Sequence, residues 1–203
     1  MWGASIQYRD DPHVFVAGDH LIYPVEGQPG IRAAPDVYVA SGRPKGRRGS
    51  YQVWNEGGIF PQVVMEVWSK GNQIDAMQKK FEFYQKYGAD EYYIVFPDFP
   101  AYFHGWIREG DKLVMVADMH GHVSPLLGWR FEKDLGDIAV YGLNGDLLIL
   151  PTDIAEQRDE ERAHAARFAA ERDAANAERD AERKRAAKSD AERDTANAAR
   201  DAE

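Results

Sequence analysis

The chain has 203 residues, of which 44% are hydrophobic and 12% aromatic, as is typical of a globular protein with one sizeable core. The absence of cysteine excludes disulfides and thiolate metal sites and, with no signal-like N-terminus, leads us to expect a cytoplasmic protein. No apolar run approaches the roughly 20 residues of a membrane helix, and the net charge of −9 argues against a general attraction to nucleic acid, although a local basic face remains compatible with it.

Up to Pro151 the sequence predicts a sheet with one clear helix. Runs rich in β-branched and aromatic residues predict strands at 13–18, 21–25, 36–40, 62–68, 91–96, 101–107 and 112–117. Between the fourth and fifth runs, apolar residues at three- and four-residue steps predict an amphipathic helix that ends at Gly88; they are Ile74, Met77, Phe81 and Tyr84. A strand, a helix and a strand in this order form a βαβ unit, so we expect 62–68 and 91–96 to be neighbours in the sheet.

Beyond Pro151 the composition changes abruptly to Ala, Arg, Lys, Asp and Glu. Phrases such as "AERDAAN" and "AERDAER" recur at seven-residue offsets and predict a charged Ala-rich helix. The heptad spacing favours a coiled coil and a homo-oligomer, but Ala buries little apolar area, so a single solvated helix is the alternative. We therefore predict a globular domain at 1–152 and a helical tail at 153–203.

One residue in the fourth strand is out of place. Glu66 interrupts the apolar run "VVMEVW", and an ionised carboxylate is costly to bury without a partner. A structural ion pair with an arginine or lysine is one interpretation. The other involves Asp36, which opens the preceding strand, because two carboxylates on adjacent strand ends can hold a hard divalent cation such as magnesium. Lys80 on the helix that follows can then act on a water nucleophile and offset charge on a phosphate.

Three segments carry a resemblance to a known family. The blocks "APDVYVASG", "PQVVMEVWSK" and "DAMQKKFEFYQKYGADEYYIV" resemble the Uma-two family of "putative restriction endonucleases" (domain of unknown function 820) in the PD-(D/E)xK nuclease superfamily. Blocks in the same order extend the resemblance over roughly 13–150. It implies an α/β, restriction-endonuclease-like fold: a mixed sheet with flanking helices and a magnesium or manganese site at its edge.

The resemblance also implies roles for individual residues. Asp36 and Glu66 match the family's acidic residues and would ligate the metal, and Lys80 matches its lysine. In the superfamily's plain motif the lysine lies two residues after the acid. That position is Trp68 in this chain, so the ammonium group must come from the helix, and Lys70 and Lys79 remain rivals.

A basic loop follows Asp36. The segment "GRPKGRRGSY" places Arg43, Lys45, Arg47 and Arg48 among glycines, where they either contact DNA backbone phosphates or form a solvated connection.

Together these features predict a metal-dependent endonuclease, a hydrolase that cleaves phosphodiester bonds of DNA. A catalytically weak nucleic-acid-binding module and a structural or regulatory protein that assembles through its tail are the alternatives.

The domain boundary generates a testable prediction. Removal of residues 154–203 should leave the domain folded, because its predicted strands and helix lie upstream and a polar Ala-rich helix contributes little burial. Circular dichroism and light scattering of the full and truncated chains check this. A fall in the number of chains per particle after truncation would indicate paired heptads, whereas an unfolded truncated chain would contradict the boundary.

Overall fold

The computed structural model describes residues 7–68, 72–98, 100–134, 137–149 and 179. The chain divides into two compact units, residues 1–155 and 156–203. The fold below concerns the first unit, since the predicted Ala-rich tail lies almost wholly outside the described residues, as does Lys70. No helix in the described ranges has both the length and the apolar character needed to cross a membrane.

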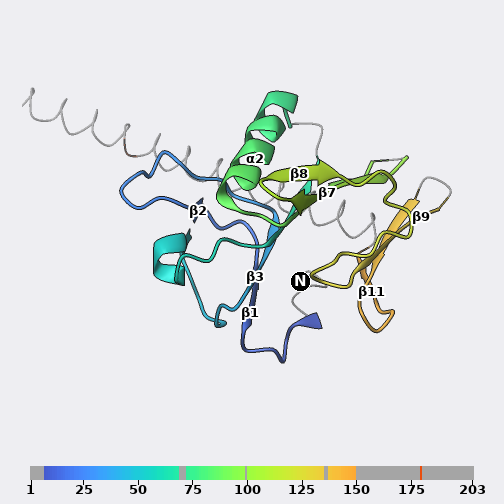
Figure 1. The fold of residues 1–203 in the computed structure, drawn as a ribbon, viewed down its shortest axis with the longest axis horizontal. Coiled ribbons are helices and arrows are strands. Elements are labelled where there is room, and N and C mark those ends of the chain that lie inside the picture. The colour runs from blue at the N-terminus through green and yellow to red at the C-terminus, as the bar shows by residue number, and fades with distance from the viewer. Residues whose placement is uncertain (1–6, 69–71, 99, 135–136, 150–178, 180–203) are drawn as a thin grey trace, which may run out of the picture. The chain divides into compact units, whose positions relative to one another are not determined.

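A mixed sheet of six strands forms the centre of the first unit (Figure 1). Its order is β1-β3-β5-β6-β7-β8; β5 and β6 pair in parallel, and every other neighbouring pair is antiparallel. The mixed sheet predicted from the sequence is therefore confirmed. The strands are β1 (Val14–Ala17), β3 (Val37–Ser41), β5 (Val63–Val67), β6 (Glu91–Phe96), β7 (Tyr102–Glu109) and β8 (Lys112–Met115).

Helix α2 (Ile74–Tyr87) connects the two parallel strands, as the βαβ pattern predicts. Gly88 ends it in the left-handed region, with φ 107°, and donates its N–H to the carbonyl of Tyr84 at 3.2 Å. Met77 and Tyr84 are buried against the sheet. Ile74 is 80% exposed, so the packed stripe begins one turn later than the periodicity predicts.

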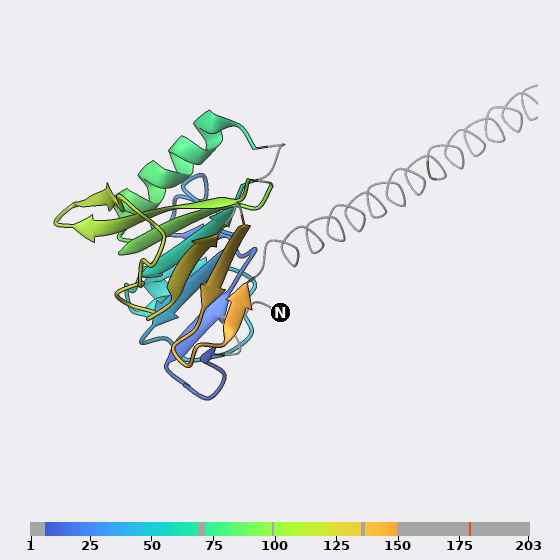
Figure 2. The same cartoon turned by 90° about the vertical axis from the view of Figure 1, so that its right-hand side faces the viewer.

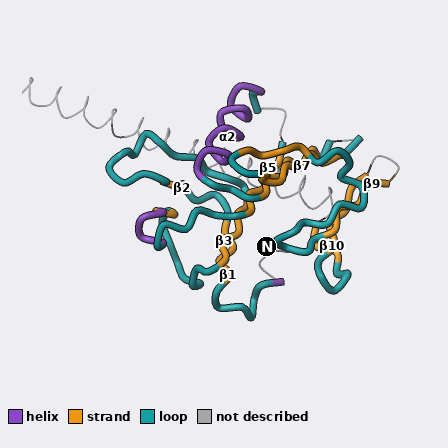
Figure 3. The backbone as a smooth tube through the Cα atoms, in the orientation of Figure 1, coloured by secondary structure: helices purple, strands orange, loops and turns teal. Residues whose placement is uncertain are grey.

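Each face of the central sheet has its own cover. The core on one face joins the sheet to α2 and to a loop-rich segment with β2 (Ile22–Tyr23), β4 (Tyr51–Gln52) and the 3-10 helix η1 (Val53–Glu56) (Figure 3). The core on the other face contains Trp129, Phe131 and Val140 from the segment of a second, three-stranded sheet (Figure 2). That sheet comprises β9 (Arg130–Asp134), β10 (Asp137–Tyr141) and β11 (Leu147–Ile149).

The expectation of several flanking helices is wrong in one respect, because a second sheet covers one face of the central sheet in the described residues. Where the resemblance implies helices around the sheet, antiparallel strands cover the second face in the described part of the chain. No strand is predicted from the sequence after residue 117, because β9 has a single apolar residue, Phe131, and β11 is only three residues long, so neither shows a clear alternating pattern.

Glu91 accepts hydrogen bonds that connect the segment before β9 to the central sheet. This carboxylate is 1% exposed at the start of β6. It accepts hydrogen bonds from the hydroxyls of Tyr93 and Ser124 and from the N–H of Leu126, the last at 2.7 Å. Neutral donors from β6 itself and from residues 124–126 therefore satisfy this buried carboxylate, which links the two segments.

Replacement of Glu91 tests this link. Glu91→Ala leaves buried donors without an acceptor, so we expect the free energy of unfolding to fall by about 3 kcal/mol or more in urea denaturation. Glu91→Gln keeps an acceptor and should cost about 1 kcal/mol. The exposed Glu109 at the end of β7 provides the control, since Glu109→Ala should change stability by less than about 0.5 kcal/mol. Equal losses for Glu91→Ala and Glu109→Ala would contradict the role of Glu91.

Candidate active site

Glu66 is the buried centre of the site. It lies in β5 between β3 and β6, and its residue is 1% exposed. Its side chain points to the α2 face of the sheet, because the hydroxyl of Tyr84 in α2 donates to Glu66 Oε1 at 2.7 Å. The sequence places this carboxylate in an apolar strand, and helix α2 supplies the hydrogen-bond donors that a buried carboxylate requires.

Lys80 completes the contact between α2 and Glu66. Its Nζ donates to Glu66 Oε2 at 2.7 Å and to the carbonyl of Ala34 at 2.9 Å. Lys80 and Tyr84 are four residues apart, so both face the sheet one turn from each other. They bind the two oxygens of one carboxylate from the same helix face.

Asp36 lies beside Glu66 on the neighbouring strand. Val37 of β3 pairs with Met65 of β5, so the same register carried one residue further sets Asp36 opposite Glu66. Asp36 Oδ2 accepts the N–H of Val67 at 2.6 Å. The structure therefore brings together the three residues predicted to form the site, Asp36, Glu66 and Lys80.

The electrostatics of Glu66 follow from this geometry. Burial raises the pKa of Glu66 to about 7, and the charge of Asp36 adds to the rise, while Lys80 and the Tyr84 hydroxyl oppose it. Two carboxylates side by side in a partly desolvated position favour a cation or a proton between them. Glu66 thus has a raised pKa, as groups at functional sites often do.

The other lysines differ in placement. Lys79 is next to Lys80 in sequence, but its side chain is 78% exposed and its Nζ lies 3.9 Å from Asp75 Oδ2. One residue turns an α-helix by about 100°, so the two lysines face different directions. Lys70 lies outside the described residues. Of the two lysines on α2, Lys80 is the one that contacts Glu66, and Lys79 lies near Asp75.

Two arginines of the basic loop, Arg43 and Arg48, form ion pairs within the protein. Arg43 Nε lies 3.0 Å and Arg48 Nε 2.6 Å from the carboxylate of Glu56, which is 8% exposed. The hydrogen bond from Arg48 is the main cause of a lowered pKa at Glu56. Lys45 donates to the backbone carbonyls of Tyr8 and Arg9, whereas Arg47 is exposed. Of the predicted phosphate contacts, Lys45 and Arg47 are exposed, whereas Arg43 and Arg48 are partly buried at Glu56.

Asp19 is a neighbour of the site that the sequence analysis missed. It follows β1 with φ 56°, and its N–H donates to the carbonyl of Pro35 at 3.0 Å. Burial and the charge of Asp36 raise the pKa of Asp19, whereas His20 and Lys80 lower it. The phrase "AGDH" signals a turn, but nothing in it indicates which strand the turn lies against.

The donor set suits a hard divalent cation. Carboxylate oxygens are the ligands that magnesium prefers, and this ion commonly takes one or two carboxylates with waters and substrate phosphates. Asp36 and Glu66 supply such a pair. No group of three or more His, Cys, Asp or Glu residues in the described ranges is arranged to hold a metal.

A family model and a solved structure are similar to this chain. A family model described as "Uma2: Putative restriction endonuclease" matches residues 3–104, which is half of the chain and includes Asp36, Glu66 and Lys80. No curated protein matches. One similar solved structure is a "putative nuclease belonging to DUF820" from Anabaena variabilis ATCC 29413, with 10% sequence identity and a TM-score of 0.44. The match covers 61% of this chain and 65% of that one, which is less than two thirds of its length.

The charge of Glu66 can be measured directly. We expect its side-chain carboxyl to titrate near the pKa of about 7 in a ¹³C NMR pH series, and Lys80→Met to raise that pKa because a stabilising positive charge is lost. The pKa of this carboxyl in the unfolded chain is near the ordinary 4.5. Between pH 4.5 and about 7 the carboxyl is therefore protonated in the folded chain and ionised in the unfolded chain. This group's contribution to stability should therefore fall as pH rises through that window.

Lys79→Met is the matched control, because Lys79 is exposed on the same helix and pairs with Asp75. It should leave the Glu66 titration unchanged. A Glu66 pKa that stays near 4.5, or that moves equally in the two lysine variants, would contradict the geometry of the site.

Proposed function

The chain belongs to the Uma2 family, and from this premise we propose that it is a metal-dependent endonuclease that hydrolyses phosphodiester bonds of DNA. The observation that carries the proposal is the buried Glu66, held by Lys80 and Tyr84 beside Asp36. A purely structural ion pair does not require the second carboxylate. A site that gathers a divalent cation does, because each carboxylate supplies a hard oxygen ligand.

Asp36 and Glu66 would hold magnesium or manganese at the strand ends. A bound ion of this kind supplies Lewis-acid stabilisation of phosphate oxygens and lowers the pKa of a coordinated water. Hydrolysis adds a water oxygen to phosphorus and breaks the bond to the leaving sugar oxygen, which takes up a proton. The residues must therefore orient a water and offset the negative charge that grows on phosphate.

Lys80 would serve the second task. Its ammonium group lies 2.7 Å from Glu66 Oε2 and its side chain is 29% exposed, so it connects the buried carboxylate to solvent. Tyr84 has a different role, because it lies within the core and its hydroxyl fixes the orientation of Glu66. The restriction-endonuclease-like fold, the cytoplasmic location and assembly through the tail remain parts of the same proposal.

One observation favours the alternative of a nucleic-acid-binding module without strong catalysis. Both oxygens of Glu66 already accept hydrogen bonds from the protein, from Lys80 and Tyr84. A metal would compete with these donors. The two functions therefore differ in whether the site binds an ion.

Cleavage of DNA by purified variants tests the proposal. With magnesium or manganese, we expect the unmodified chain to cut and a chelator to stop it. Glu66→Gln and Asp36→Asn should lose cleavage and manganese binding, because each removes an ionised ligand. Lys80→Met should retain manganese binding, since both carboxylates remain, yet cut about 100-fold more slowly or worse.

The same assay includes its control. Lys79→Met should cut at the unmodified rate, because this lysine faces away from Glu66. DNA binding without cleavage and without manganese binding would favour the binding module. If Lys79→Met loses cleavage while Lys80→Met does not, the assignment of the lysine is wrong.

A further inference from the structure

A cavity of about 360 Å³ lies in the segment that contains β2, β4 and η1. The residues that line it come from β2, the turn after β2, β4 and η1, and they include Tyr23, Gln28, Ser50, Gln52 and Trp54. Small-molecule sites begin near 300 Å³, so the volume is sufficient for a ligand of one or two rings. We call this space the Trp54 cavity.

The strand register explains why aromatic side chains line the Trp54 cavity. Strands β2 and β4 pair in parallel, with Ile22 opposite Tyr51 and Tyr23 opposite Gln52. Ile22 and Tyr51 are buried in the core on the α2 face, so the next pair points away from that core. Tyr23 and Trp54 are half-buried, and neither belongs to the described cores of the two sheet faces. Their rings therefore line the cavity instead of closing the core.

The turn after β2 adds polar groups to the lining. Gly27 adopts φ 75°, and the N–H of Gln28 donates to the carbonyl of Val25 at 3.4 Å. Gln28 is exposed and Ser50 is half-buried. Within the described ranges, neither side chain forms a hydrogen bond with the protein, and neither ring of the cavity stacks on another aromatic ring. The cavity thus offers ring faces, an amide and a hydroxyl to a ligand.

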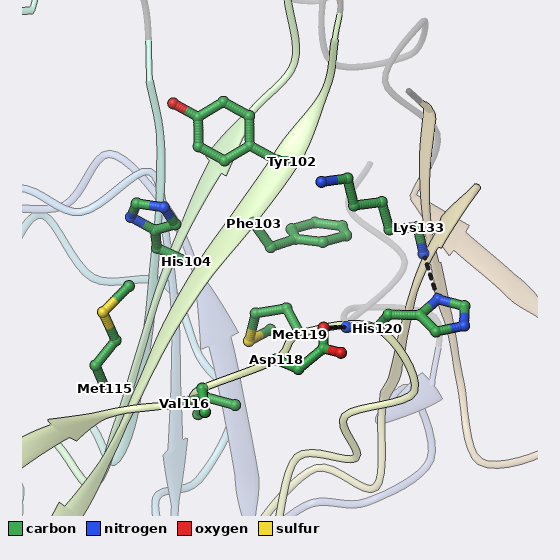
Figure 4. Close-up of a pocket in the computed structure, with 10 residues that line it drawn as sticks. Tyr102, Phe103, His104, Met115, Val116, Asp118, Met119, His120 and Lys133 are labelled. Atoms are coloured by element: carbon green, nitrogen blue, oxygen red, sulfur yellow. Dashed lines mark hydrogen bonds between the residues drawn. The ribbon is translucent and has the colours of Figure 1, made fainter. Parts of the chain in front are cut away.

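The polar groups of another cavity are used within the protein. This cavity lies beyond the end of β8 and has a volume of about 230 Å³ (Figure 4). His120 Nδ1 accepts the backbone N–H of Lys133 at 3.3 Å, and Asp118 Oδ1 accepts the N–H of His120 at 2.9 Å, as the dashed lines in Figure 4 show. The Trp54 cavity is therefore the better candidate for a ligand.

The basic loop leads into the Trp54 cavity. Arg48 pairs with Glu56 of η1 at 2.6 Å, which holds the loop beside the 3-10 helix that carries Trp54. Arg47 is exposed and forms no ion pair in the part of the chain that the structure describes. It precedes Ser50 by three residues, which an extended chain spans in about 10 Å. A positive charge is therefore available near the rim of the cavity.

A short path connects the Trp54 cavity to the candidate active site. Lys80 Nζ donates to the carbonyl of Ala34 at 2.9 Å. The adjacent Ala33 exchanges both backbone hydrogen bonds with Ile22, which precedes Tyr23. Consecutive Cα atoms lie about 3.8 Å apart and such paired residues about 5.5 Å, so the backbone of Tyr23 is within about 20 Å of the Lys80 ammonium group. A DNA strand rises about 3.4 Å per nucleotide, and therefore about six nucleotides span both places.

The chemistry of the lining favours a nucleobase. None of the residues that line the cavity is charged, so the cavity suits an uncharged ring and not a phosphate. Aromatic side chains stack on the face of any base, and a glutamine amide can form hydrogen bonds with a base edge. Arg47 can contact the adjoining phosphate. A base inside a duplex is already stacked on both faces, so only an unstacked base can enter.

We propose that the Trp54 cavity binds one unstacked base of the DNA strand and that Arg47 contacts the phosphate beside it. The inference rests on the proposed endonuclease function and adds to it a recognition subsite, separate from the residues that act on the cleaved bond. Tyr23 and Trp54 would stack on the base, and Gln28 would contact its edge.

Binding of a fluorescent oligonucleotide tests this inference without any cleavage. The full chain is titrated, in the presence of a chelator, with a single strand of about 12 nucleotides that carries 2-aminopurine, whose emission falls when it stacks. We expect quenching on binding. Trp54→Leu should weaken single-strand affinity on the order of tenfold and reduce the quenching, whereas Trp54→Phe keeps a ring and should bind within about threefold of the unmodified chain.

Further variants separate stacking from charge. Tyr23→Leu repeats the test at the second ring, should Trp54→Leu fail to fold by circular dichroism. Arg47→Gln should weaken binding and reduce the dependence of affinity on salt by about one phosphate contact, but leave the quenching of the bound strand unchanged. Lys112→Gln is the matched control, because Lys112 is exposed at the start of β8, and it should change neither property.

Two other probes identify the ligand. A duplex of the same sequence should bind equally to the unmodified chain and to Trp54→Leu. Deoxyadenosine monophosphate should compete only weakly, and competition at the affinity of the strand would overturn the assignment to DNA. Absence of quenching, or equal single-strand affinity in the Leu and Phe variants at Trp54, would overturn the inference.

The inference and the proposed function can fail separately. Binding that depends on Trp54 in a chain that binds no manganese and never cuts DNA would refute the endonuclease and leave the base-binding cavity standing. Metal-dependent cutting of single strands that is indifferent to Trp54→Leu and Tyr23→Leu would refute the cavity alone.

Discussion

The hydrogen bonds from Lys80 and Tyr84 to Glu66 connect the helix of this domain to its sheet. A carboxylate in the middle of a buried strand loses its hydration, and its neighbours along β5, Met65 and Val67, are apolar. The crossover helix therefore supplies the donors, and its rotation is fixed by the need to bring both of them to one carboxylate. Packing of Met77 and Tyr84 against the sheet favours the same rotation of the helix.

Three buried glutamates in this domain show different ways of satisfying a charge. Glu56 takes two arginines, which lower its pKa, and Glu91 takes neutral donors. Glu66 has a cation, a hydroxyl and a second carboxylate, Asp36, so its charge is only partly compensated. The first two arrangements stabilise the fold locally. The third leaves the pKa of Glu66 raised, and the proposed metal site rests on this difference from the other two glutamates.

The central sheet also determines what lies near the site. Alternate side chains of a strand share one face, so Glu66, Ile94 and His104, which pair across three neighbouring strands, point to the same side. The second face is closed by the three-stranded sheet. The candidate site therefore lies on the face that α2 covers, where Lys80 and Tyr84 reach Glu66.

The sequence by itself determined the local features: the strands, the helix between the parallel pair, its end at Gly88 and the acidic residue within an apolar strand. These follow from periodicity and from the cost of burial, which act over a few neighbouring residues. The distinction between Lys80 and Lys79 required the tertiary structure, because both fit the sequence pattern and only the rotation of the packed helix separates them. The pairing of Glu56 with Arg43 and Arg48, and the position of His104 in line with Glu66, also depended on packing. Such contacts join segments that are far apart along the chain, and no local pattern specifies which of many polar or aromatic residues will meet when the sheet closes.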